Sequence, residues 1–378
     1  MLKIAFITGS PFGTIGTSAS YNFVSEISRH HEVMVLSPQT QPNDQPLVFH
    51  DSSLRLEDIF DIETERQLFK AWHFLCDFKP DIVHLFNHRQ AYRYPFFLRH
   101  LFPRAKWVLD IRSPLLGKKR KRLQIKRQNL PLPFFIDAIC THSRASVHTH
   151  MPFSIHRIVE TPPGVDLNRF HPSIPVANKV MCRNFVFVGS LSPIRKIEFL
   201  IEHFSALASN SDQQIHLDII GGGPAEKQLV RMIKSNEYGK FVRLVGVKNQ
   251  NELLTSLSSY DAGIAYVPNG PHETAPSLKS IEYAASGIPV FASDTPGHQT
   301  YAKRGFVFTF FKNTPASFKH AIGMAIQEGV IVHSIQTNLK IVTDYDWAAI
   351  VQKKLLPLYR RLTKGTYGKP KKENTYAQ

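Results

Sequence analysis

Residues Thr274 to Val290 read TAPSLKSIEYAASGIPV, and this stretch indicates a helix that runs directly into a buried strand. Pro276 suits the first turn of a helix, and the hydroxyl of Ser277 is placed to help cap it. Gly287 fits the C-terminal end of the helix, after which Ile288-Pro289-Val290 starts an apolar strand. A helix followed at once by an apolar strand is the repeating unit of an α/β protein.

The same alternation extends outward from this stretch over both halves of the chain. Continuous apolar runs of four to six residues are typical of strands that are buried on both faces of a parallel sheet. We expect such strands in KIAFITG, HEVMVLSP, DIVHLFN, KWVLDIR, FIDAICTHS, NFVFVGS, IHLDIIGGGP, FVRLVGV, DAGIAYVP and PVFASD. We expect helices over residues 17–29, 57–78, 197–209, 225–235, 250–259 and 277–286, and a last one after Asp346. This order predicts a doubly wound α/β sheet in each half.

A passage dense in proline separates the two halves and is interpreted as an interdomain linker. A chain of 378 residues is long enough for two domains. We therefore expect an N-terminal domain over 1–170 and a second domain over 171–346. A closing helix over 347–362 would return to the first domain, and a basic tail would occupy 363–378.

The composition excludes several classes of protein. Hydrophobic residues make up 43% and charged residues 20%, as in chains that bury real cores, so disorder is not the main state. No apolar run approaches the roughly 18–20 residues that cross a bilayer. The start, MLKIAFITGS, is interpreted as a first strand and not as an export signal. Three cysteines, Cys76, Cys140 and Cys182, lie far apart and fit a reducing cytoplasm.

The net charge of +16 belongs to two segments and not to the whole surface. Arg112 to Arg127 holds eight basic residues and no acid, and so does Lys353 to Lys372. Without these sixteen, 30 basic residues stand against 30 acidic ones. Such patches attract polyanions, either nucleic acid or anionic lipid, unless they are only a solvated face and a floppy tail. Nucleic acid is disfavoured, because the chain has no RNP motif, no paired Cys/His and no basic heptads.

Two places in the second half suit a bound pyrophosphate. Gly189 to Lys196, GSLSPIRK, joins a strand to a helix and brings two cations beside backbone N–H groups, although a glycine after a strand is often only a turn. Lys279 lies in the first turn of the helix described first, near any anion docked there. Glu282 follows one turn later, where a carboxylate can accept hydrogen bonds from vicinal hydroxyls; the alternative is a surface glutamate. The glycines of the first half, GSPFGTIGTSAS, lack the G-x-G-x-x-G spacing of dinucleotide-binding enzymes.

Five motifs, in order, resemble the retaining glycosyltransferases of family 4, the group 1 transferases with the GT-B fold. They are PDIVHLFNH, PPGVDLNRFHP, GSLSPIRK, IIGGGP and the run from Ser277 to Val290, and together they span nearly the whole chain. The resemblance implies two Rossmann-like lobes that face a central cleft. The first lobe would take a glycan or lipid-linked acceptor, and the second a UDP- or GDP-linked sugar.

The resemblance also implies roles for individual residues. Lys196, helped by Arg195, would neutralise the diphosphate, while Glu282 would hold the ribose hydroxyls and backbone near Val247 would face the base. The implied donor-binding residues are Gly16, Ser190, Arg195, Lys196, Gly223, Val247, Thr274, Ser277, Leu278, Lys279 and Glu282. The implied catalytic residues are Arg112, Asp110 and Lys196. Arg112 or Asp110 would replace a histidine that is common in the first lobe.

Two positions depart from the family pattern. Ser190 stands where the family often has arginine, and Thr274 stands where it has the first of two glutamates, with Glu273 one residue away. These departures keep open a catalytically degraded relative that acts by binding. A nucleotide-sugar epimerase or phosphorylase of the same fold is the other alternative.

No metal or cofactor is expected. The chain has neither H-E-x-x-H nor Asp-x-Asp, and His142, His148 and His150 are interpreted as surface or loop histidines. The expected protein is a cytoplasmic hexosyltransferase of envelope polysaccharide or glycoconjugate synthesis. It would sit on the inner face of an anionic membrane through Lys118–Arg127 and Lys353–Lys372.

Overall fold

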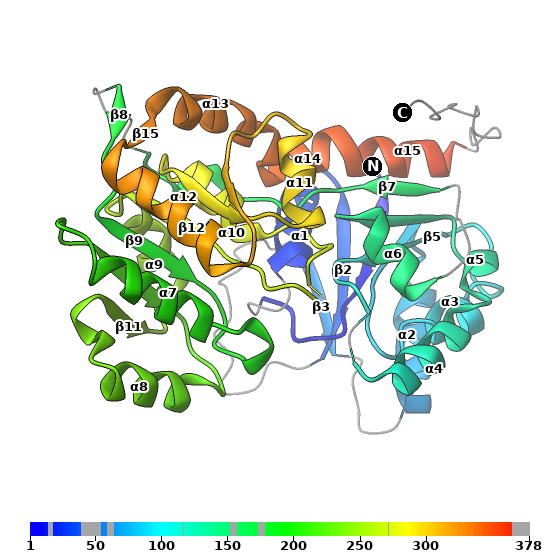
Figure 1. The fold of residues 1–378 in the computed structure, drawn as a ribbon. Helices are drawn as coiled ribbons and strands as arrows, with labels where there is room; N and C mark the ends of the chain where they lie inside the picture. The colour runs from blue at the N-terminus through cyan, green and yellow to red at the C-terminus, as the bar shows by residue number, and fades with distance from the viewer. Residues whose placement is uncertain are drawn as a thin grey trace, which may run out of the picture. The chain divides into compact units, whose positions relative to one another are not determined.

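The computed structural model describes residues 1–13, 18–38, 54–58, 64–115, 117–151, 157–172, 178–270 and 272–364. The chain divides into two compact units, which Figure 1 shows as sheets covered by helices. Unit 1 consists of Met1–Pro162 and Trp347–Gln378, and unit 2 of Pro163–Asp346.

Unit 1 holds a parallel sheet in the order β3-β2-β1-β4-β5-β6-β7, a doubly wound order whose direction turns between β1 and β4. Its strands are β1 Lys3–Ile7, β2 Glu32–Ser37, β3 Leu54–Asp58, β4 Ile82–Phe86, β5 Lys106–Ile111, β6 Ala138–Thr141 and β7 Ile158–Glu160. Its helices before residue 162 are α1 Ser18–Ser28, α2 Thr64–Phe78, α3 Arg93–Leu98, α4 Lys119–Asn129, α5 Leu132–Phe135 and α6 Arg144–His150. The expected strands of this half are confirmed to within a few residues.

Alternate residues of each central strand enter different cores. In β1, Ala5 and Ile7 join a cluster covered by α2, α3, α5 and α6, while Ile4 and Phe6 join a cluster on the opposite face. Because a strand points successive side chains to opposite sides, a run that is apolar throughout needs cover on both faces. The apolar run KIAFI therefore specifies a central strand.

The second face of unit 1 is covered by the end of the chain. A continuous helical stretch comprises α14 Trp347–Ile350, the π-helix η6 Val351–Leu355 and α15 Leu356–Thr363. The π-turns lie just before Pro357, which has no N–H to continue the α-helical ladder. Its buried apolar side chains pack against β1 and α1: Trp347, Ile350, Val351, Leu355, Leu356, Leu358, Tyr359 and Leu362.

Unit 2 repeats the doubly wound order in its sheet, β11-β10-β9-β12-β13-β14. The strands are β9 Asn184–Val188, β10 His216–Ile220, β11 Val242–Gly246, β12 Ala262–Ala265, β13 Val290–Ser293 and β14 Thr309–Phe311. The helices are α7 Glu198–Ala208, α8 Glu226–Ser235, α9 Gln250–Leu257, α10 Leu278–Ala285, α11 Pro296–Ala302, α12 Pro315–Gln327 and α13 Val332–Val342. An antiparallel pair, β8 Lys179–Val180 and β15 Val330–Ile331, and the short turns η2 Leu167–Arg169, η3 Pro193–Arg195, η4 Tyr238–Lys240 and η5 Thr343–Tyr345 complete the unit.

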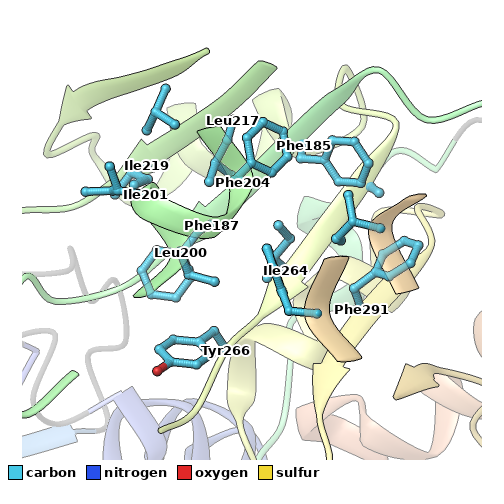
Figure 2. Packing of buried hydrophobic residues seen from close by; sticks show 14 of the residues in the cluster. Phe185, Phe187, Leu200, Ile201, Phe204, Leu217, Ile219, Ile264, Tyr266 and Phe291 are labelled. Atoms are coloured by element: carbon cyan, nitrogen blue, oxygen red, sulfur yellow. The ribbon is translucent and has the colours of Figure 1, made fainter. Parts of the chain in front are cut away.

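The sheet of unit 2 also separates two cores. Phe185 and Phe187 of β9 pack with α7 and α12 on one face, the cluster drawn in Figure 2. Val186 and Val188 pack with α9 and α10 on the other. Three layers follow from this alternation, and they hold the carboxyl ends of the strands in fixed positions.

Two expectations about boundaries are wrong. Residues 57 and 58 are not helical but belong to β3, which pairs with β2 from Leu54 to Asp58, and α2 begins only at Thr64. The two-residue period of LRLED, apolar at Leu54 and Leu56, indicates a strand, whereas the helical prediction followed the apolar residues farther along.

The domain boundary also lies earlier than the predicted residue 170. Val165 and Phe170 are buried in the core of unit 2, and the Val165 N–H donates to the Tyr345 carbonyl at 2.9 Å. The described part of the proline-dense passage after Pro162 is therefore attached to unit 2, because Val165 and Phe170 are buried there. Among the described residues, no helix is both long and apolar enough to cross a membrane.

Candidate functional site

The strand order of unit 2 turns between β9 and β12, and ligands of doubly wound sheets bind outside the carboxyl ends of the strands at such a point. Because the strand pairs of this sheet are parallel, the loops after β9, β10, β11 and β12 leave from one edge. These loops and α10 contain the predicted residues of this unit: Ser190, Arg195, Lys196, Gly223, Val247, Thr274, Ser277, Leu278, Lys279 and Glu282. Gly16 lies outside the described residues.

The loops after β9 and β10 are bound to each other. The Leu191 N–H donates to the Gly222 carbonyl at 2.9 Å, and the Ala225 N–H donates to the Leu191 carbonyl at 2.8 Å. A Cβ on Gly221 would lie 1.9 Å from the Gly189 carbonyl oxygen, and one on Gly223 would lie 2.6 Å from that of Leu191. Both glycines also have positive φ. The close packing of these two loops thus explains the glycines of the IIGGGP motif. Gly223, in the loop after β10, is nevertheless exposed.

Two cations end the loop after β9. Lys196 has a left-handed backbone, with φ 48° and ψ 48°, and lies exposed between η3 and α7. A non-glycine residue is rarely held in this region without support from its surroundings. Burial lowers the pKa of Arg195, and the pKa of His272 is lowered by burial and by the positive charge of Arg195. Arg195 therefore lies near enough to act electrostatically on the loop before α10, whereas Ser190 is exposed.

The start of α10 differs from the prediction. Ser277 is the residue that precedes the helix, but its side chain makes no capping hydrogen bond, and Pro276 lies one residue farther outside. The helix begins at Leu278, and the Ser277 carbonyl accepts a 2.9 Å hydrogen bond from the Tyr301 hydroxyl. Without a side-chain cap, the N–H groups of the first turn have no partner within the helix and are available to an anion.

Glu282 is the buried carboxylate of this edge. Its side chain is only 6% exposed and lies 2.5 Å from Nζ of Lys279, one turn earlier. The alternative of a surface glutamate is therefore wrong. The pair places a cation between the start of α10 and a carboxylate one turn later in the same helix.

The loop from His272 to Ser277 is held by α11. The Gly297 N–H donates to the Glu273 carbonyl at 2.7 Å, and a Cβ at Gly297 would lie 2.3 Å from the Ala275 carbonyl oxygen. The Glu273 carboxylate accepts from the Gly270 N–H at 3.0 Å and so stabilises its own turn. The hydroxyl of Thr274 is buried and has no hydrogen-bond partner among the described residues. It is a free polar group in this loop.

The sequence reasoning overlooked His298, in the first turn of α11. Its Nδ1 lies 2.7 Å from the Ser293 carbonyl oxygen, so this nitrogen carries the proton. Burial lowers the pKa of His298 to about 4. Its Nε2 is buried and has no partner within the described chain. The helix-start signal Thr295-Pro296 marks the turn that places this histidine.

Val247 follows β11 and is 76% exposed. A Cβ on Gly222 would lie 2.8 Å from Val247 Cγ2, so the exposed side chain covers the glycine turn after β10. An exposed apolar side chain next to a glycine turn offers a flat surface to a planar group.

Unit 1 contains a buried ion pair at the end of β5. Asp110 is fully buried, and Arg112 reaches both of its oxygens, with Nε 2.6 Å from Oδ1 and Nη2 2.7 Å from Oδ2. Arg112 also donates to the Thr161 carbonyl at 3.0 Å and stacks 4.9 Å from the Phe23 ring centroid. Burial acts to raise the pKa of Asp110, but Arg112 and the hydrogen bond from His84 outweigh it and lower this pKa. Asp110 therefore stays ionised and orients Arg112.

His84 connects this pair to the end of the chain. Its Nε2 lies 3.2 Å from Asp110 Oδ2 and its Nδ1 2.6 Å from the Tyr359 hydroxyl. Burial lowers the pKa of His84, so the ring is neutral. Since Asp110 only accepts, Nε2 donates to it and Nδ1 accepts from Tyr359. The sequence motif PDIVHLFNH had marked this histidine only as part of a strand.

His84, Asp110 and Cys140 bring three possible metal ligands within 4.8 Å of one another. Both ring nitrogens of His84 are already bonded, Asp110 pairs with Arg112, and burial raises the pKa of Cys140 well above its usual value. The cluster therefore works as a hydrogen-bonded network, not as a cation site.

The three histidines after β6 differ from one another. His148 is exposed, as expected, but His150 is buried, with Nε2 2.9 Å from the Ser113 carbonyl oxygen. Burial lowers the pKa of His142 to about 3, and its Nδ1 is buried without a partner in the described structure. The interpretation of His150 as a surface residue is wrong, because α6 turns it toward the chain after β5.

Comparison with known families gives a match in the second half of the chain. Residues 177–342 match the model of the family described as glycosyl transferases group 1. No curated protein sequence matches the chain.

Solved structures share the complete fold at low sequence identity. Sucrose-phosphate synthase from Thermosynechococcus elongatus is 16% identical with a TM-score of 0.74, over 97% of this chain and 100% of that one. HepE of Anabaena, in complex with UDP, is 15% identical with a TM-score of 0.69, over 93% and 98%. The lipopolysaccharide outer core galactosyltransferase WaaB is 13% identical with a TM-score of 0.69, over 96% and 99%. The two Rossmann-like units are those of a GT-B fold.

Proposed function

Because residues 177–342 match the model of the group 1 glycosyl transferases, we propose that this chain transfers a sugar from a nucleotide-sugar to a glycan or lipid-linked acceptor, with retention at the anomeric carbon. The observation that carries the proposal is the buried Glu282, paired with Lys279 at the carboxyl edge of the unit 2 sheet. Arg195 and Lys196 lie in the loop after β9, which starts at the same edge of the sheet. One edge thus offers a carboxylate for sugar hydroxyls and cations for phosphates.

The leaving diphosphate would be stabilised by charge and by backbone dipoles. The uncapped first turn of α10 presents the N–H groups of Leu278 and Lys279. Lys196 adds a flexible ammonium, and Arg195 supplies the cation that Ser190 does not. Stabilising charge that develops on the leaving group is the largest contribution such a site can make. These groups supply the positive charge themselves, so we propose that catalysis needs no resident metal.

Glu282 would accept hydrogen bonds from the two ribose hydroxyls, with Val247 beside the base. We propose a uridine or guanosine nucleotide; HepE, a structural neighbour, binds UDP. The free hydroxyl of Thr274 lies in the loop before α10 and would face the donor sugar. The carboxylates of Glu273 and Glu282 already hold a backbone N–H and Lys279, so neither is free as a covalent nucleophile.

In unit 1 we assign different roles to the two predicted catalytic residues. Arg112 would act on the reacting groups, and its side chain is 15% exposed. Asp110 is fully buried, so it would be a positioning residue that holds Arg112 in one orientation. The hydrogen bonds from Arg112 to Asp110 and to Thr161 keep the guanidinium in place.

Glu282→Gln tests the site directly. It replaces an ionised acceptor, whose hydrogen bonds contribute about 1.5–3 kcal/mol, so UDP or GDP without a sugar should bind roughly 10- to 150-fold more weakly in calorimetry. Glu273→Gln is the control, because its amide oxygen still accepts from Gly270, and binding should stay within twofold of wild type. A loss confined to the intact nucleotide-sugar would move Glu282 from the ribose to the donor sugar.

The donor itself is found by thermal shift over a panel of nucleotide-sugars. A ligand at about 100 times its Kd stabilises the folded state by about 2.7 kcal/mol. NMR of the product made with the best donor then reports the anomeric configuration. Conversion of the donor without any acceptor would favour the epimerase or phosphorylase alternative.

A further inference from the structure

We propose that α3, α4 and α5 of unit 1 form a docking surface that inserts into an anionic lipid membrane. The proposal goes beyond the transfer reaction and rests on unit 1 alone. It concerns more than the basic residues, because an apolar surface continues directly from them.

The first observation is the charge of one segment. Residues 89–136 contain thirteen lysines and arginines and a single acid, Asp110. Asp110 is fully buried and paired with Arg112, so this segment adds no negative charge to the surface of unit 1. The seven basic residues of Lys118–Arg127 form no ion pair with another described residue.

The second observation is that α4 is electrostatically unfavourable by itself. Lys118 precedes the helix without a side-chain cap, and the first turn is basic, with no acid. Cations at a helix N-terminus oppose the helix dipole, and like charges one turn apart repel each other. Of its side chains only Asn129 is buried, so packing offsets little of this repulsion. An anionic surface would remove the conflict.

The third observation is apolar side chains exposed beside this helix. Eight large hydrophobic residues are exposed in the described part of unit 1, and six of them lie in α3, α4, α5 or their ends. These six are Phe96, Phe97, Leu101, Leu123, Leu130 and Phe134, the last of them 86% exposed. Aromatic and aliphatic side chains next to a cluster of cations are typical of helices that lie in a membrane interface.

The exposed side chains are gathered on neighbouring elements and are not scattered over unit 1. The rings of Phe96 and Phe97 lie 5.0 Å apart, and Phe96 lies 5.2 Å from Phe135, which joins α3 to α5. Leu123 lies on α4, and Leu130, the residue that ends this helix, follows seven positions later, so the two share a helix face. Only Leu130 and Pro131 separate α4 from α5. Lipid is favoured over nucleic acid, since leucines do not stack on bases.

The other predicted basic segment does not join this surface. Residues 353–364 belong to the helical stretch that covers the face of the sheet around Ile4 and Phe6. In contrast, α4 contacts α6, which covers the opposite face, and Figure 1 shows α15 and α4 at opposite ends of unit 1. The expectation that both segments face one membrane is therefore wrong for the described residues. Residues 365–372 lie outside them.

The test is co-sedimentation of the full chain, without nucleotide-sugar, with phosphatidylcholine vesicles that contain 0–40% phosphatidylglycerol. We expect binding that rises with anionic content and falls at least tenfold in 0.5 M salt, because salt screens the attraction. Arg120→Gln/Lys121→Gln should weaken it about 25-fold, at about fivefold per charge near the surface. Lys303→Gln/Lys312→Gln in unit 2 is the matched charge control and should change nothing.

The apolar contribution is tested separately. Phe134→Ala should weaken vesicle binding about tenfold, while Phe69→Ala, an exposed phenylalanine of α2 outside the surface, should leave it unchanged. No binding to anionic vesicles at low salt would overturn the proposal. Vesicle binding that is unchanged in Phe134→Ala would also overturn it. So would competition in which single-stranded DNA abolishes vesicle binding while the Phe134 variant behaves as wild type. Since nucleotide-sugar binding is measured without vesicles, failure here leaves the proposed transfer untouched.

Discussion

Lys196 combines a strained backbone with a proposed role at the diphosphate. Its left-handed φ of 48° lies where the chain passes from η3 into α7. Strain held at a ligand-facing position is typical of functional sites. Two different substitutions separate the effect of its backbone conformation on stability from the effect of its charge on donor binding.

Lys196→Ala should lower donor affinity by roughly 10- to 150-fold, because a charge-assisted hydrogen bond contributes about 1.5–3 kcal/mol. Lys196→Gly should lose the same affinity but fold about 1 kcal/mol more stably than the alanine variant, since glycine adopts this backbone without strain. Calorimetry with the nucleotide-sugar and urea unfolding measure the two effects. Unchanged affinity in both variants would remove Lys196 from the site, and a larger loss in Arg195→Ala would exchange the two roles.

His298 predicts how the stability of unit 2 depends on pH. Its pKa is about 4 in the folded chain and about 6.5 when unfolded, so above pH 6.5 both states are neutral and it has no effect. As the pH falls from 6.5 to 4, only the unfolded state gains the proton, and stability drops by about 1.4 kcal/mol per pH unit. His298→Asn should remove this slope in urea unfolding measured between pH 7.5 and 5. An equal slope in both proteins would mean that the buried ring is protonated without cost.

At the scale of elements, the loops after β9 and β10 act as one unit. Their mutual hydrogen bonds and the absent side chains of Gly221 and Gly223 let the two turns touch. The loop that carries Lys196 is thus placed by a strand to which it is not adjacent in sequence.

Gly221→Ala should therefore destabilise the chain by several kcal/mol, because its Cβ would overlap the Gly189 carbonyl at a positive φ. Where the protein still folds, donor affinity should fall as well, since the displaced loop carries the cations. Gly323→Ala is the control: it lies in α12 with open space around its Cβ position and should stabilise slightly. Thermal unfolding and donor titration of the two variants decide this, and a neutral Gly221→Ala would contradict the loop packing.

At the scale of the whole molecule, the helical stretch after Asp346 completes the fold of unit 1. Eight buried apolar side chains between Trp347 and Leu362 cover one face of the unit 1 sheet. Tyr359 adds a buried hydrogen bond to His84, and His84 in turn holds Asp110. Unit 1 is therefore closed only after unit 2 has been synthesised.

A chain ending at Asp346 should lose the fold of unit 1. Eight buried side chains at about 1.5–3 kcal/mol each contribute about 12–24 kcal/mol in total, which is comparable to or larger than the usual stability of a domain, about 5–15 kcal/mol. Calorimetry should show one unfolding transition instead of two, and UDP should still raise the remaining one. A chain ending at Lys364 keeps the helical stretch and is the control. Two intact transitions in the shorter chain would show that unit 1 does not need this cover.

How well a feature could be predicted from the sequence depends on how far apart in the chain its interacting residues lie. Apolar runs such as KIAFI and NFVFV, and the helix start at Ser277, depend on neighbours in the sequence, so most strands of the two sheets and α10 were predictable from local patterns. The motif from Ser277 to Val290 also placed Glu282 and Lys279 correctly on one helix. Local patterns missed the short strands β3, β7 and β14, which have three to five residues, and the helices α3 to α6 and α11 to α13.

The sequence by itself determined the alternation of strands and helices, the two doubly wound units and the residue types at the candidate site. Only the tertiary structure decided that Asp110 is buried under Arg112, that His84 reaches Tyr359, that Val165 packs with unit 2, and that α4 continues into an exposed apolar surface. The physical reason is that burial and pairing are properties of contacts between distant segments. The sequence around a carboxylate does not show whether its side chain faces solvent or an arginine. Residues that are distant in the sequence but close in space determine this.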